Sequence, residues 1–141
     1  MAYFEDSAEL RRIMGGFFEQ MREDGQFGPQ VRAAAVQATF FFSDPALTVT
    51  IDAVSPPQQG GDFNVYYGDP PLEAPLKLSL SADNAHRLWQ GRLNVMLALS
   101  QNQIGIEGSM GRALALLPAV QPAFARYRAY LGEIGRPDLL A

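Results

Sequence analysis

Apolar residues recur at three- and four-residue spacing near the N-terminus, which is typical of an amphipathic helix. The stripe consists of Leu10, Ile13, Met14, Phe17, Phe18 and Met21. Asp6 precedes it and suits a helix N-cap, and the pair Gly28-Pro29 suits a helix end. The spacing therefore predicts one helix here, interrupted by a Gly15-Gly16 pair that a close neighbour would explain but for which the sequence gives no firm reason.

A two-residue apolar period follows between residues 32 and 81. Every second position is apolar in four segments, which run from Ala34 to Phe42, Leu47 to Ala53, Phe63 to Tyr67 and Leu76 to Leu80. One dry face and one wet face is the pattern of antiparallel strands. Ser43-Asp44-Pro45-Ala46 predicts a hairpin turn between the first two of them.

The rest of the chain returns largely to helical spacing. Asp83 is expected to cap a short helix from Asn84 to Gln90, and Ser109 a later one. The other predicted elements are a helix at Val95–Gln101, a strand with Ile104 and Ile106, a helix at Met110–Leu117 and a final helix at Ala119–Ile134. Together these predict an α/β (α+β) fold, in which helices cover one face of a five-stranded, mainly antiparallel sheet. Residues 1–141 are expected to form a single domain.

The amino-acid composition limits the kinds of catalytic and metal site that are expected. The chain has no cysteine and one histidine, His86, so thiolate sites, disulfides and histidine-rich metal sites are not expected. No nucleophile elbow or metalloprotease motif occurs. The sequence therefore predicts no enzyme, no catalytic residues, and no metal or other cofactor.

Charge and hydropathy set expectations for partners and location. The net charge is −4, and no run of Lys or Arg is present to neutralise phosphates, so nucleic acid is not an expected partner. The N-terminal residues carry acids where a signal peptide carries bases, and no apolar stretch approaches the ~18 residues of a membrane span. A cytoplasmic protein with no integral membrane segment is expected.

The order of motifs from Leu76 to Leu117 resembles the sterol carrier protein type 2 family. A strand and an Asp-led helix are followed by Gly91–Asn94 (GRLN), an apolar helix, a short strand and Gly108–Gly111 (GSMG) at a helix start. At residues 102–105 this chain has Asn-Gln-Ile-Gly, where the family often has Gly-Lys-Leu-(Lys/Arg). The resemblance implies a stand-alone bacterial member that binds lipids in an apolar cavity between the sheet and its helices.

The resemblance also implies which side chains would contact a ligand. The candidates for the cavity lining are Phe40, Phe42, Trp89, Met96, Leu99, Ile104, Met110, Leu114 and Leu117. Interiors pack tightly, so the alternative is that all of them are ordinary core residues. His86 is expected on the surface, with contact to a lipid headgroup as the other possibility. Arg92 is expected to be structural or to pair with an anionic headgroup.

The sequence is compatible with two functions. The favoured one is reversible binding and transport of a hydrophobic small molecule, namely a fatty acyl, sterol-like or isoprenoid lipid, in an enclosed cavity between the sheet and Val95–Leu117. The alternative is an accessory domain for dimerisation or for contact with a lipid-modifying enzyme, so a homodimer or an enzyme partner is left open. In the carrier interpretation, the helix at Ala119–Ile134 is expected to act as a lid.

Overall fold

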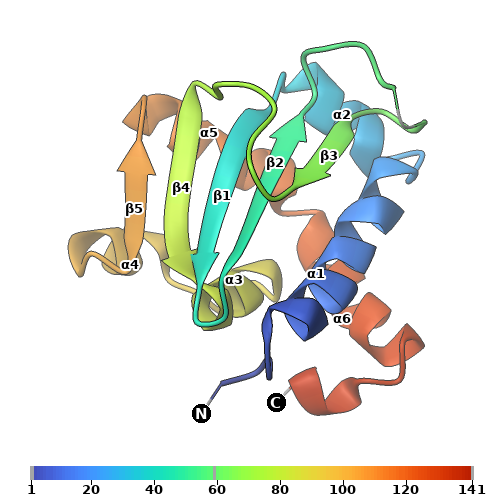
Figure 1. Cartoon of the computed structure of the whole chain (residues 1–141), viewed down its shortest axis with the longest axis vertical. Coiled ribbons are helices and arrows are strands. Elements are labelled where there is room, and N and C mark those ends of the chain that lie inside the picture. The colour runs from blue at the N-terminus through green and yellow to red at the C-terminus, as the bar shows by residue number, and fades with distance from the viewer. Residues whose placement is uncertain (1, 59, 141) are drawn as a thin grey trace.

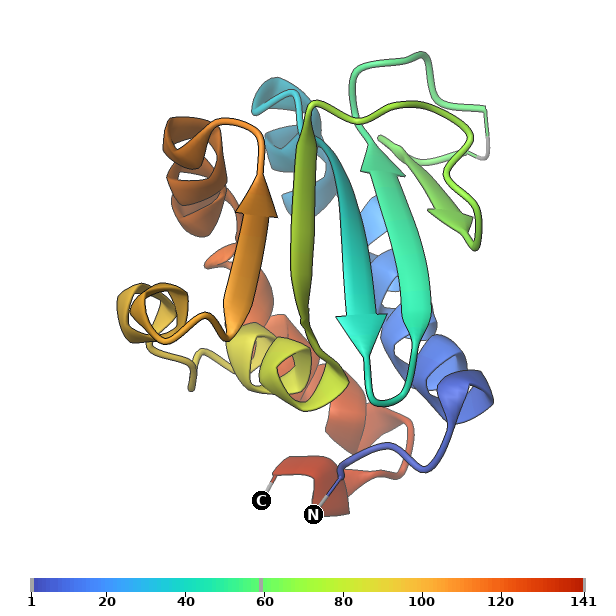
Figure 2. The same cartoon turned by 60° about the vertical axis from the view of Figure 1, so that its left-hand side comes forward.

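A computed structural model describes residues 2–58 and 60–140 of the chain. Five strands form one sheet, and the helices gather on one side of it (Figures 1 and 2). The strands are β1 (Gln37–Ser43), β2 (Leu47–Asp52), β3 (Asn64–Tyr67), β4 (Leu76–Ser81) and β5 (Ile104–Glu107). The α+β class that the alternation predicts is confirmed.

The sheet is mixed, and one of its four neighbouring pairs of strands is parallel. The strand order is β3-β2-β1-β4-β5, with β1 parallel to β4 and every other neighbouring pair antiparallel. The β1–β2 pair is the predicted hairpin, closed at residues 44–46. Because β4 lies beside β1, the long segment between residues 53 and 75 carries the chain out to the edge strand β3 and back.

The N-terminal region contains two helices instead of the one predicted. The first, α1 (Ser7–Arg22), begins at Asp6, whose side chain accepts from the backbone N–H of Glu9 at 2.8 Å. The second, α2 (Phe27–Ala33), contains Gly28 and Pro29, which were expected to end a helix. Pro29 instead occupies the first turn of α2, where a backbone N–H has no partner within the helix, so its absence costs little.

The C-terminal half contributes α3 (Ala82–Trp89), α4 (Val95–Ser100), α5 (Met110–Val120), α6 (Ala123–Glu133) and the 3₁₀ turn η1 (Pro137–Leu140). Ser109 caps α5 as predicted, and Asn94 caps α4. The cap of α3 is Ser81, whose hydroxyl accepts from the N–H of Asn84; Asp83 instead accepts from the N–H of Tyr3 at 2.9 Å. Pro118 lies inside α5, which therefore continues past its expected end at Leu117.

The last helix is part of the core, which corrects its expected role as a lid. Tyr127 and Leu131 of α6 are fully buried, and the hydroxyl of Tyr130 donates to the carbonyl of Ile13 in α1 at 2.6 Å. Opening such a helix would expose several large side chains at once, at a cost comparable to the whole stability of a small domain.

Candidate functional site

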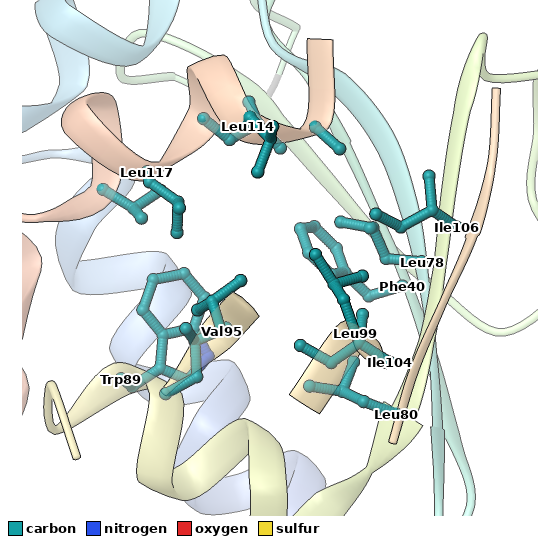
Figure 3. A pocket seen from close by; sticks show the side chains of 14 residues that line it. Phe40, Leu78, Leu80, Trp89, Val95, Leu99, Ile104, Ile106, Leu114 and Leu117 are labelled. Carbon is teal, nitrogen blue, oxygen red and sulfur yellow. The ribbon is translucent and has the colours of Figure 1, made fainter. Parts of the chain in front are cut away.

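An apolar pocket lies between the sheet and the segment from α3 to α5. It is lined by Phe40, Leu78, Leu80, Leu88, Trp89, Val95, Leu99, Ile104, Ile106, Ala113, Leu114, Leu116, Leu117 and Val120. Figure 3 shows these side chains converging on one space from opposite walls. None of the fourteen is ionisable, so the lining has nothing that could act as an acid, a base or a metal ligand.

Strand register builds one wall of the pocket. Phe40 of β1 pairs with Leu78 of β4, and Leu78 pairs with Ile106 of β5, so the three form a row on the face toward the helices. The opposite wall comes from α5, where residues 113, 116, 117 and 120 have the spacing of one helical face. Apolar residues of the strands therefore face apolar residues of α5 across the pocket.

The hollow between these walls is small and partly open. Its volume is about 70 Å³, whereas typical small-molecule sites have about 300–1,000 Å³. Five lining residues are buried, among them Phe40, Trp89 and Ala113, and the other nine are partly exposed. The structure thus has an open apolar pocket where an enclosed cavity of ligand size was expected. A long apolar molecule fits only if the walls move apart.

Six of the nine predicted lining residues line the pocket, namely Phe40, Trp89, Leu99, Ile104, Leu114 and Leu117. Three do not, which corrects the prediction. Phe42 is on the same strand face as Phe40 and stacks on it with ring centroids 6.0 Å apart, so it is a core residue. Met96 and Met110 are 63% and 49% exposed. Met96 lies on the outer side of α4, and Met110 is the first residue of α5, directly after the turn that leaves the edge strand.

Sequence reasoning missed the other eight lining residues. Leu78, Leu80 and Ile106 were expected as apolar strand residues, but only the strand pairing brings them to the pocket. Val120 was missed because α5 was expected to end before Pro118. Its four-residue spacing from Leu116 was the signal available in the sequence.

Trp89 carries the polar atom of the lining that lacks a partner. Within the described part of the chain its indole Nε1–H is buried without a hydrogen bond. A buried donor left unsatisfied costs about 1–3 kcal/mol. The ring itself packs edge-on against Phe17 and Phe18 of α1, with centroids 5.7 and 5.6 Å away, so it separates the pocket from the main core.

His86 is buried, contrary to the expected surface position, and it contacts residues near both ends of the chain. Because a carbonyl only accepts, His86 Nε2–H donates to Leu139 O at 2.7 Å, and Nδ1 accepts from the Tyr127 hydroxyl at 2.7 Å. The ring of Tyr3 packs on the imidazole at 4.4 Å. Burial lowers the pKa of His86, although the hydrogen bond to Leu139 opposes this. The imidazole is therefore a neutral structural group, away from the pocket lining.

Arg92 also has a structural contact. Its guanidinium donates to the carbonyl of Leu140 at 2.7 Å. Among residues 2–58 and 60–140, no group of three or more His, Cys, Asp or Glu side chains is placed to hold a metal ion. In the same part of the chain, no helix has the length and apolar composition needed to cross a membrane.

Comparisons with known proteins give structural but not sequence matches. No family model matches the chain, and no curated protein matches it in sequence. Sterol carrier protein 2 domains share the fold. The sterol carrier protein domain 2 of Helicoverpa armigera aligns with a TM-score of 0.62 and 21% identity over 89% of this chain and 97% of its own.

Two further solved structures extend this comparison. The palmitated SCP2L2 protein of Aedes aegypti aligns with a TM-score of 0.50 and 14% identity over 74% of this chain and 90% of its own. A sec-alkylsulfatase from Pseudomonas aligns with a TM-score of 0.56 and 13% identity over 73% of this chain, but over only 15% of the enzyme. The resemblance to sterol carrier protein 2 is therefore confirmed as a likeness of fold.

Proposed function

We propose that this protein binds the hydrocarbon chain of a lipid, with a fatty acyl chain as the preferred ligand, in the pocket lined by β1, β4, β5 and α3–α5. The observation that carries the proposal is the chemistry of the lining, which is entirely apolar and lacks ionisable groups. Burial of hydrocarbon is worth about 25 cal/mol per Å² before ordering costs are deducted. The structures that share the fold, one of them palmitated, support the same ligand class.

The walls formed by α4 and α5 are expected to move outward when the ligand enters. Of the described residues of α4, only Ala98 is buried, and in α5 only Ala113 is. By contrast, α1 buries eight residues, and α6 is tied to α1 by Tyr130. Segments with few buried apolar contacts open at the lowest free-energy cost. The mobile wall in this proposal is therefore α4 with α5, in place of the C-terminal helix.

Chemical catalysis is not part of the proposal, because the pocket offers a site for apolar contact alone. The match to a small part of an alkylsulfatase shows that such a fold also occurs within a larger enzyme. An accessory role without ligand binding is therefore the outcome that the experiment must separate from the carrier role.

The test is native mass spectrometry of delipidated protein mixed with dodecanoate and, separately, with dodecan-1-ol. Ala113→Leu places a larger side chain in the hollow and should reduce binding by at least about tenfold. Ala125→Leu makes the same change at an exposed position of α6 and should bind as the original protein does. Absence of binding to both ligands by the original protein would leave the accessory role.

A further inference from the structure

A second hollow, larger than the apolar pocket, opens beside it on the surface. It has a volume of about 410 Å³ and is lined by Ala34, Ala35, Val36, Gln37, Leu76, Arg112, Ala115 and Leu116. These residues come from the connection between α2 and β1, the start of β1, the start of β4 and one side of α5. We call it the α5 groove. Its volume is within the range of small-molecule sites.

Arg112 is the charged side chain of the α5 groove. It is exposed, and within residues 2–58 and 60–140 its guanidinium has no ion pair or hydrogen bond. Gln37, the other polar lining residue, already donates its amide to Asp52 at 3.2 Å. The groove therefore has one charged group, the Arg112 guanidinium, beside a mostly apolar lining. A guanidinium pairs well with a carboxylate.

Leu116 connects the α5 groove to the interior. It lines the groove, the apolar pocket, and a third hollow of about 30 Å³ under α1 and α2. Arg112, Leu116 and Val120 follow one another at four-residue spacing along α5, so they lie on one stripe about 12 Å long. Arg112 belongs to the groove, Leu116 to all three hollows, and Val120 to the two inner ones.

We infer that the α5 groove holds the anionic headgroup of the ligand, a carboxylate paired with Arg112, while the hydrocarbon chain passes Leu116 into the apolar pocket. The inference rests on the proposed function and adds to it a preference for fatty acids over neutral lipids. Displacement of Leu116 joins the groove to the pocket, which also provides the volume that the pocket alone lacks.

The test compares dodecanoate with dodecan-1-ol, below their aggregation limits, on three proteins. Replacement Arg112→Gln should weaken dodecanoate binding roughly three- to tenfold, as expected for a partly exposed ion pair, and leave the alcohol unchanged. Arg92→Gln removes the same charge beside the C-terminus and should leave the preference for dodecanoate intact. Circular dichroism checks that each variant is folded.

The outcomes are separable. A preference for dodecanoate that disappears in Arg112→Gln and falls with added salt supports the inference. Equal binding of both ligands by the original protein, a preference that survives Arg112→Gln, or one that disappears in Arg92→Gln overturns it, while the carrier function stands. If neither ligand binds, the proposed function fails and the headgroup site fails with it.

Discussion

The hydroxyl of Tyr130 lies directly over the bare backbone of Gly16, and there it donates to the carbonyl of Ile13 at 2.6 Å. A Cβ at residue 16 would lie closer to this oxygen than atoms pack in proteins. Gly15 is covered in the same way by Tyr67, whose hydroxyl donates to the Gly15 carbonyl at 3.2 Å. The glycine pair of α1 thus allows two tyrosines from distant elements to reach its backbone.

Gly16→Ala is expected to lower the free energy of unfolding by about 1–3 kcal/mol, because it displaces Tyr130 and leaves buried polar groups unsatisfied. The matched control is Gly132→Ala in α6, where nothing lies within 4 Å of the added Cβ. That change should raise stability by about 0.5–1 kcal/mol through helix propensity alone. Urea unfolding of both variants measures the difference. Equal effects at the two glycines would refute the close approach.

The single histidine makes the pH dependence of stability simple to interpret. Burial lowers the pKa of His86 in the folded state below the value of about 6.5 in the unfolded chain. As the pH falls past that value, the unfolded state binds a proton and the folded state does not. The free energy of unfolding should therefore fall between about pH 7.5 and about pH 5.5.

The measurement is the melting temperature of untagged protein across that range, compared with His86→Asn. The variant starts less stable, because contacts with Tyr127 and Leu139 are weakened. Its melting temperature should nevertheless change less with pH. A pH dependence as steep in the variant as in the original protein would contradict the assignment to His86, which faces Asp83, Arg87 and Arg92 electrostatically.

Substitutions at two residues of α4 distinguish a ligand in the pocket from a ligand on the outer surface of the helix. Leu99 lines the pocket, so Leu99→Asp should weaken fatty acid binding at least about tenfold, because a carboxylate there is poorly solvated. Met96 is 63% exposed, and Met96→Asp should change stability by less than about 0.5 kcal/mol and leave binding unaltered. Fluorescence displacement titrations compare them. Similar losses in both variants would place the ligand on the outer side of α4.

Trp89 is the one tryptophan of the sequence, and it lines the pocket. A fatty acid brominated midway along its chain should quench the emission of Trp89 by direct contact. The quenching should saturate, and it should reverse when unbrominated fatty acid is added. Binding without quenching would mean that the chain runs elsewhere.

The fold was predictable from local patterns, since alternation and helical spacing identify β1, β2, β4 and α1 without tertiary information. The apolar site was predictable only in part. Phe40 and Leu117 follow from their periods, but Leu78 and Ile106 reach the pocket through strand order, which local sequence does not encode. Met110 shows the reverse failure: its helical phase suits the pocket, but its place at the first turn of α5 leaves it exposed.

The burial of His86 and the identity of the residue that covers Gly16 were unpredictable for a related reason. Two hydrogen-bond partners of His86, Tyr127 and Leu139, come from α6 and η1, and the residue that covers Gly16 is 114 residues away in α6. Contacts between residues this far apart leave no periodic signal in a single sequence. The burial of a polar side chain becomes explicable only when its hydrogen-bond partners are in place.

The most direct test of lipid binding in the pocket is NMR of methyl-labelled protein with saturating dodecanoate. A ligand in the pocket should give intermolecular NOEs from its chain to the methyl groups of Leu99, Ile104 and Leu117, and none to Met96. NOEs confined to exposed methyl groups, or none under conditions in which the ligand is soluble and the protein folded, would contradict it.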